Sequence, residues 1–204
     1  MSVEEYLRFE ESSERKHEYV AGEVYAMSGV TRRHARIVNN IAFRLTGAAR
    51  GGPCEVISVD VKLRAATDRI YYPDVMVLCT PGPDEALVLE DPCLVVEVTS
   101  PSTARTDRGE KLGAYQGVPS LRAYLIVDHR RRRVERHWRD AAGAWQRDEI
   151  VGEGRVPVPC PATELALDDI YEGVHLAIVG EPEPWAYADD ALEDEPDPDE
   201  VYDA

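Results

Sequence analysis

RIYYPDVMVLC (Arg69–Cys79) and DPCLVVEVTS (Asp91–Ser100) are two short, nearly continuous apolar runs bounded by proline or polar residues. Runs of this kind predict strands that are buried on both faces of a sheet. Each run nevertheless carries one acid in its interior, Asp74 in the first and Glu97 in the second. An isolated buried carboxylate costs free energy unless it is paired or binds a metal. The two acids therefore mark a candidate functional site inside the sheet.

Helix and strand patterns alternate on both sides of these runs. Apolar residues recur at helical spacing from Thr31 to Arg50, where Gly51-Gly52 ends the helix, and EVISVDVKLR (55–64) alternates as a single strand. The other expected elements are a capped helix at 2–10, two short strands in 17–29, a helix in 107–117, a strand at 121–128, an exposed hairpin around 142–143, and a strand with a short helix in 156–171. This order predicts an α/β domain with a central mixed β-sheet flanked by helices.

Charge is distributed unevenly along the 204 residues. The net charge is −16, but residues 181–204 hold 11 acidic residues and no Lys or Arg, which leaves 28 acidic and 23 basic residues in 1–180. A segment with high net charge and little to bury stays unfolded. We therefore expect one domain over residues 1–178 and an acidic, disordered tail over 179–204.

The chain has no apolar run near the roughly 20 residues that span a bilayer, and its N-terminal stretch lacks the apolar core of a signal peptide. The four cysteines form no C-x-x-C pair. Cys79 and Cys93 lie in or beside strand-like runs, which predicts reduced core residues. Together these features predict a cytoplasmic protein without a membrane partner.

Asp74 and Glu97 fall in strands expected to be adjacent, so their carboxylates can converge. Two close carboxylates repel unless a cation lies between them, and Mg²⁺ is typically held by one or two carboxylates. A nearby lysine would complete a site for phosphodiester hydrolysis, in which a metal activates water and the lysine stabilises charge.

Several segments resemble one known family. Pro73-Asp74, followed after 22 residues by Glu97-Val98-Thr99, resembles the PD-(D/E)xK motif of restriction-endonuclease-like nucleases, with Thr99 at the usual lysine position. KHEYVAGEVYAMSG, YYPDVMVL and LVVEVTSPSTARTDRGEKLGAYQGVPSLRAYLIVD resemble the Uma-two family of bacterial endonucleases over roughly residues 1–175. This resemblance implies a restriction-endonuclease-like fold and a metal-dependent endonuclease that acts on DNA with Mg²⁺ or Mn²⁺.

The resemblance also implies roles for particular residues. Asp74 and Glu97 would bind the metal together with the backbone carbonyl of Val98, and Lys111 on the following helix would be the catalytic lysine. Further candidates are Glu18 or Glu23 as an additional carboxylate, His34 as a substrate contact, and Lys62 as an alternative to Lys111.

Arg130, Arg131, Arg132 and Arg133 form the strongest basic cluster, which could contact nucleic-acid phosphates, lie in solvent or bind the acidic tail. Two functions remain open from the sequence. One is a metal-dependent DNA endonuclease, expected by analogy to be a homodimer. The other is a non-catalytic interaction protein that keeps the nuclease fold and binds a basic partner through its tail.

Overall fold

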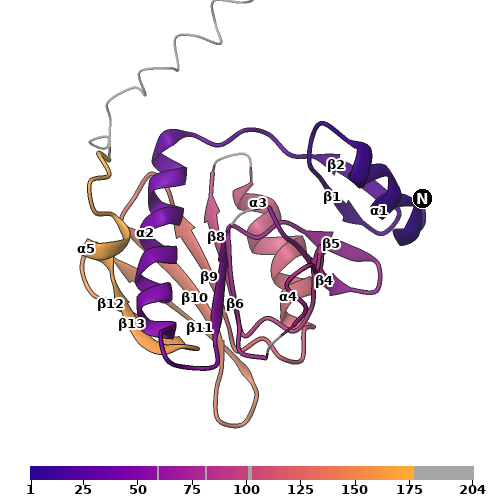
Figure 1. The fold of residues 1–204 in the computed structure, drawn as a ribbon. Helices are drawn as coiled ribbons and strands as arrows, with labels where there is room; N and C mark the ends of the chain where they lie inside the picture. The colour runs from indigo at the N-terminus through magenta and orange to yellow at the C-terminus, as the bar shows by residue number, and fades with distance from the viewer. Residues whose placement is uncertain (59, 81, 101–102, 177–204) are drawn as a thin grey trace, which may run out of the picture. The chain divides into compact units, whose positions relative to one another are not determined.

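A computed structural model describes residues 1–58, 60–80, 82–100 and 103–176. The expected tail at 179–204, including its predicted disorder, lies outside the described residues. The remainder is a mixed α/β structure with two larger sheets, a small hairpin and helices (Figure 1). Among the described residues, no helix is both long and apolar enough to cross a membrane.

The central sheet has six strands in the order β11-β10-β9-β8-β6-β3. Strands β8 and β9 run parallel, and the other neighbouring pairs are antiparallel, so the sheet is mixed as predicted. The strands buried along their whole length, β6 and β8, come from the apolar runs 69–79 and 91–100. The bounds are β3 Glu55–Ser58, β6 Val75–Leu78, β8 Leu94–Thr99, β9 Ala123–Asp128, β10 Arg133–Arg139 and β11 Trp145–Val151.

A second sheet has five strands in the order β2-β1-β5-β4-β7, and a separate hairpin is formed by β12 and β13. The bounds are β1 His17–Val20, β2 Glu23–Ala26, β4 Lys62–Ala66, β5 Arg69–Tyr71, β7 Val88–Leu89, β12 Arg155–Pro159 and β13 Ala162–Ala166.

The described residues also form six helical segments, and the longest of these is the expected helix α2, Arg32–Ala49. Its N-cap is Thr31, whose hydroxyl accepts a hydrogen bond from the His34 amide. The others are α1 Val3–Ser12, α3 Ala104–Thr106, the π-helical turn η1 Asp107–Lys111, α4 Leu112–Gln116 and α5 Leu167–Ile170.

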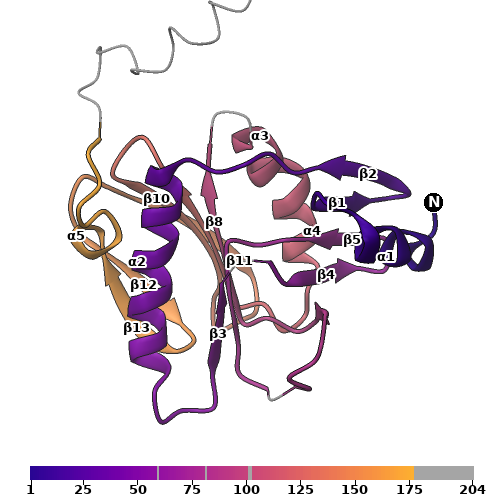
Figure 2. The same ribbon diagram turned by 45° about the horizontal axis from the view of Figure 1, so that its top comes forward.

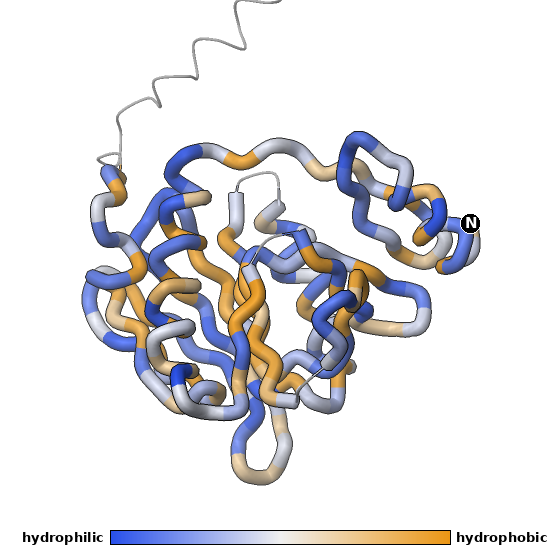
Figure 3. Tube along the Cα trace, in the orientation of Figure 1, coloured by the Kyte–Doolittle hydropathy of each residue, from blue (hydrophilic) through white to orange (hydrophobic). Residues whose placement is uncertain are grey.

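The central sheet lies between α2 on one face and η1 with α4 on the other (Figures 1 and 2). The apolar side of α2, which includes Ile37, Ile41 and Leu45, is fully buried. On the opposite face Tyr115 of α4 packs into a core cluster with Val95 of β8. Figure 3 shows that the most hydrophobic stretches are these central strands. The two layers fix the positions of side chains at the ends of β6 and β8.

Two strands that were expected to be continuous are broken, and those expectations were wrong. The run 55–64 divides into β3 and β4, which belong to different sheets, and Asp60 between them has a positive φ of 69°. The run 69–79 divides into β5 and β6 on either side of Pro73. Proline has no amide to donate to a strand ladder, so the chain changes sheets there.

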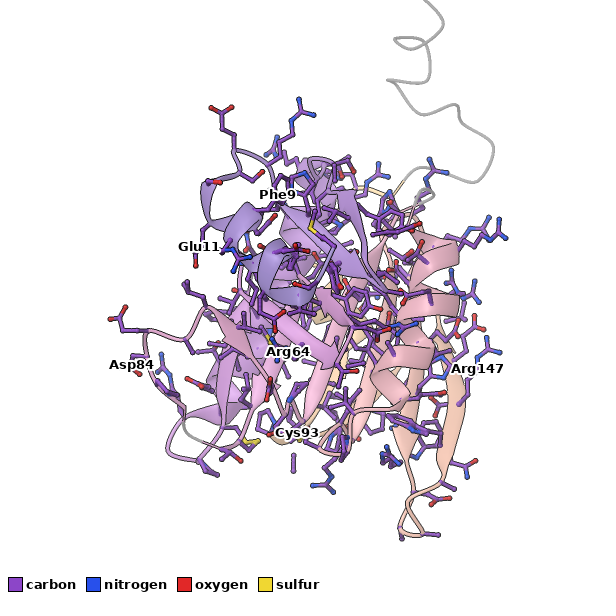
Figure 4. All side chains as sticks on the ribbon, turned by 90° about the vertical axis from the view of Figure 1, so that its right-hand side faces the viewer. Phe9, Glu11, Arg64, Asp84, Cys93 and Arg147 are labelled. Carbon is purple, nitrogen blue, oxygen red and sulfur yellow. A yellow bond between two sulfur atoms is a disulfide. The ribbon has the colours of Figure 1, made fainter. Side chains whose placement is uncertain are left out.

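The prediction that Cys79 and Cys93 are reduced is also contradicted. The structure pairs Cys79 with Cys54 and Cys93 with Cys160. The register that places Glu55 opposite Leu78 brings Cys54 opposite Cys79, a proximity that residue spacing did not reveal. Cys93 precedes β8 at one end of the strands, where Figure 4 labels it.

Candidate active site

Asp74 lies at the junction where the chain leaves the second sheet and enters the central one. It follows Pro73 and directly precedes β6. Strands β6 and β8 are antiparallel with Val75 opposite Val96, so the next pair in this register is Asp74 beside Glu97. The structure thus brings the two acids together at one end of a buried strand pair.

Glu97 is buried in β8 and receives two hydrogen bonds on the same oxygen. Lys111 Nζ lies 3.1 Å from Glu97 Oε1, and the Tyr115 hydroxyl donates to the same atom at 2.9 Å. Lys111 is itself buried, with 8% of its side chain exposed. The helical segment formed by η1 and α4 therefore places Lys111 next to Glu97.

Two residues of this network, Asp107 and Tyr115, were not identified from the sequence as site residues. Asp107 Oδ1 lies 3.9 Å from Lys111 Nζ. Asp107, Lys111 and Tyr115 are spaced four residues apart, and this spacing places them on one face of a helix. This helical spacing, applied to the segment around Lys111, was the signal that could have found them.

The second sheet contributes one more acid. Glu18 of β1 lies 2.7 Å from Lys111 Nζ through its Oε1 atom, which also accepts a hydrogen bond from the Tyr72 amide at 3.4 Å. The alternative acid, Glu23, is exposed on β2 and bonds to Tyr25 instead. Lys62, the alternative lysine, lies 5.4 Å from the centre of the Tyr72 ring. Of the two candidate acids, the structure places Glu18 beside Lys111. Of the two candidate lysines, it places Lys111 beside Glu97.

His34 and Val98 both contact Asp74. His34 Nε2 lies 2.9 Å from Asp74 Oδ1, and the Val98 amide donates to Asp74 Oδ2 at 2.7 Å. The observed Val98 contact uses its N–H group, and the role of its carbonyl as a metal ligand stays a prediction. A cavity of about 350 Å³ borders Asp74 and His34 and is also lined by Arg15 and Lys16. Asp74, just before β6, therefore borders a cavity whose lining includes Arg15 and the Lys16–Asp60 ion pair.

The electrostatics of the cluster show an excess of acid. Burial raises the pKa of Glu97 well above its usual value; Lys111 opposes this, while Asp74, Asp107 and Glu18 add to it. Burial also raises the pKa of Asp107, and Lys111 again opposes the shift. For Lys111 burial acts to lower the pKa, but Glu97, Glu18 and Asp107 outweigh it and raise the pKa above the usual value. The lysine is therefore held as a cation.

This charge balance fits a divalent metal ion. Among the described residues the cluster contains four carboxyl groups, from Glu18, Asp74, Glu97 and Asp107, against the single lysine and the His34 ring. Carboxylate oxygens are the ligands that Mg²⁺ and Mn²⁺ prefer. A cation beside Asp74 and Glu97 would offset the carboxylate repulsion that adds to the effect of burial on the pKa of Glu97.

The four arginines of the basic cluster have different surroundings. Arg132 forms an ion pair with Asp168, and Arg133 forms one with Glu149. Two of the four arginines are therefore paired with acids of the same chain. Arg130 and Arg131 are exposed in the turn after β9. Because β8 and β9 are parallel, with Thr99 opposite Asp128, this turn lies at the same end of the sheet as Glu97.

The fold and the cluster define a restriction-endonuclease-like protein, with a mixed sheet between helices and a PD-(D/E)xK-type set at the end of two strands. The chain belongs to the Uma2 family, whose model is described as "Putative restriction endonuclease" and matches residues 3–169.

Two proteins of one organism and one crystal structure are similar to this chain. The protein slr1290 from Synechocystis is 34% identical over 176 residues, which is 85% of this chain and 93% of the relative. The protein sll1609 from the same organism is 31% identical and covers 75% of this chain and 89% of its own length. A crystal structure from Anabaena variabilis, titled as a "putative nuclease belonging to DUF820", matches with a TM-score of 0.73 at 16% identity, over 86% of this chain and 99% of that one. At this identity the structural match establishes the fold.

Proposed function

We propose that this protein is a metal-dependent endonuclease that hydrolyses phosphodiester bonds in DNA. The observation that carries the proposal is the convergence of Asp74, Glu97 and Lys111 at one end of the paired strands β6 and β8. Membership of a family whose model is described as "Putative restriction endonuclease" supports the reaction class. The proposal includes a cytoplasmic location, where a nuclease meets cellular DNA, and a homodimer, which suits cleavage of both strands.

Asp74 and Glu97 would hold Mg²⁺ or Mn²⁺, with Glu18 as a nearby acid. When bound, such an ion offsets phosphate charge and makes water a stronger nucleophile. Lys111 stabilises negative charge that develops on the phosphate, and its contacts with Glu18 and Glu97 fix it in advance. Tyr115 orients Glu97 and His34 orients Asp74 through the hydrogen bonds described above.

Supercoiled plasmid is the direct test of this function. Purified protein is expected to nick or linearise the plasmid with Mg²⁺ or Mn²⁺ and to stop when EDTA is added, because the carboxylates alone do not activate water. An RNA transcript of the same sequence serves as the matched substrate. Absence of cleavage of either polymer with both metals would favour the non-catalytic interaction protein instead.

Arg130 and Arg131 are expected to bind DNA phosphates without reading sequence. Changing both to Glu should weaken DNA binding about equally for unrelated sequences and reduce the slope of log affinity against log salt by about 2. Fluorescence anisotropy across a salt series measures this effect. Arg50→Glu is the control, since Arg50 is exposed beyond α2, close in sequence to Cys54 at the opposite end of the sheet. Equal loss in the control would show a general charge effect and contradict the assignment.

A further inference from the structure

All four cysteines of the chain gather at one place. They come from four separate segments: Cys54 precedes β3, Cys79 follows β6, Cys93 precedes β8 and Cys160 follows β12. The sulfur atoms of Cys79, Cys93 and Cys160 all lie within 4.8 Å of one another, and Cys54 is bonded to Cys79. The two disulfides are therefore neighbours, and four sulfur atoms share one site.

The strand registers explain this convergence. Pairing of β3 with β6 brings Cys54 opposite Cys79, and the Cys93 amide donates to the Val77 carbonyl at 2.7 Å beside β6. Cys93 and Cys160 are buried, and Cys54 and Cys79 are partly exposed. Pairing along β6 therefore positions Cys79 and Cys93 independently of the disulfides, whereas Cys54 lies in the loop before β3 and Cys160 lies in the separate β12–β13 hairpin.

We propose that the reduced form of this cluster is a Zn²⁺ site with four cysteine thiolate ligands. Tetrahedral zinc with Zn–S distances of about 2.3 Å requires sulfur–sulfur distances of about 3.8 Å. Three sulfur atoms already lie within 4.8 Å of one another. Cys54 follows Gly51-Gly52-Pro53 in a loop, so it can separate from Cys79 once their bond is reduced. Thiolates are soft ligands that select zinc over Mg²⁺.

The chemistry balances with a thiol reductant. Each disulfide accepts two electrons and two protons from a dithiol, which becomes a disulfide, so reduction of both pairs gives four thiols. Zinc then replaces four protons as the thiolates bind. A cavity of about 470 Å³ that borders all four cysteines gives the reductant and the ion a path to the cluster.

The zinc site is separate from the candidate active site. Asp74 directly precedes β6 and Cys79 directly follows it, so the two sites lie at opposite ends of the same strand. Five residues of extended chain span roughly 16 Å. Zinc at the cysteines would connect β3, β6, β8 and the β12–β13 hairpin, which makes it a structural ion that holds the strands carrying the two acids.

The full-length protein in two redox states provides the test. Protein reduced with a phosphine, loaded with zinc and freed of excess metal should carry one Zn²⁺ per chain by native mass spectrometry. Cobalt in place of zinc should give intense thiolate-to-cobalt charge-transfer absorption. The oxidised protein should show two disulfides and no thiolate–metal absorption. A reduced protein that binds neither metal through sulfur would overturn the proposal.

Variants separate this site from the carboxylate site. Cys93→Ser with Cys160→Ser should lose the zinc and the cobalt absorption, whereas Asp74→Asn with Glu97→Gln should keep both. Zinc that stays in the cysteine variant and leaves in the carboxylate variant would overturn the proposal. If the cysteine variant does not fold, the comparison of reduced and oxidised wild-type protein still decides.

Discussion

Replacing Glu97 by glutamine is expected to reduce DNA cleavage by about 10³-fold or more while the fold is kept. Glutamine retains an oxygen that accepts from Lys111 and Tyr115, but it removes the charge that would hold the metal. Initial rates of plasmid nicking at saturating Mg²⁺ measure the loss. Asp74→Asn should behave in the same way, since it removes the second ligand.

The stability of Glu97→Gln tests the same site independently of activity. Burial raises the pKa of Glu97, so its contribution to stability is present below the pKa of the unfolded chain and is lost as the pH rises through the folded-state value. As the pH is raised, the free energy of unfolding of the metal-free variant, measured in urea, should therefore fall less than that of the wild type. Mg²⁺ should stabilise the wild type and have little effect on the variant.

Glu135→Gln is the matched control for these experiments. Glu135 is also a buried glutamate of the central sheet, but it pairs with Arg108 and His137. Glu135→Gln should lower the free energy of unfolding, but Mg²⁺ should stabilise this variant as much as it stabilises the wild type. If Glu97→Gln cuts DNA at the wild-type rate with either metal, Glu97 is not a catalytic ligand.

Lys111→Met is expected to lower the free energy of unfolding of the metal-free protein by about 3–5 kcal/mol, because the buried acids lose their common cation. Glu18, Glu97 and Asp107 raise the pKa of Lys111 against the effect of burial. The stabilisation is therefore fully present below the unfolded-state pKa of lysine, including neutral pH, and is lost only as the pH rises through the higher folded value. Urea denaturation at neutral pH with EDTA measures the change, and cleavage should be lost as well.

Lys62→Met provides the comparison, because Lys62 lies over the Tyr72 ring and does not contact the buried acids. The free energy of unfolding of Lys62→Met should differ from that of the wild type by no more than about 1 kcal/mol. Millimolar Mg²⁺ should restore part of the stability of Lys111→Met, since a divalent ion binds the remaining carboxylates. A Lys111→Met protein that is as stable as the wild type would show that the lysine does not balance the cluster.

Apolar patterning predicted the parts of the fold that local sequence controls. The helical repeat of Ile37, Ile41 and Leu45 located α2, and the two apolar runs located β6 and β8. The division of 55–64 between two sheets was missed, because alternation describes the faces of a strand and does not specify its partner. The same limit hid the pairing of the cysteines, which depends on strand register.

The motif resemblance predicted three residues of the candidate site, and helix spacing was not used to predict the others. The acids at 74 and 97 and the lysine at 111 came from the PD-(D/E)xK resemblance, and the structure brings them together. The choice of Glu18 over Glu23 could not be made from sequence, since both lie in short strands near a turn. Only the pairing of β1 with β5, which sets Tyr19 opposite Ile70, directs Glu18 toward the lysine.

Because the chain changes sheets at Pro73, the residues of the candidate site come from two sheets, and we expect the site to be completed late in folding. Glu18 belongs to one sheet and Glu97 to the other, and Asp74 takes its position only where the chain crosses between them. These contacts join residues far apart in sequence, and such contacts form slowly because they require closure of long loops. A chain in which only one sheet has formed lacks part of the acid cluster. A newly made chain would therefore hold the complete set of candidate metal ligands only once both sheets have formed.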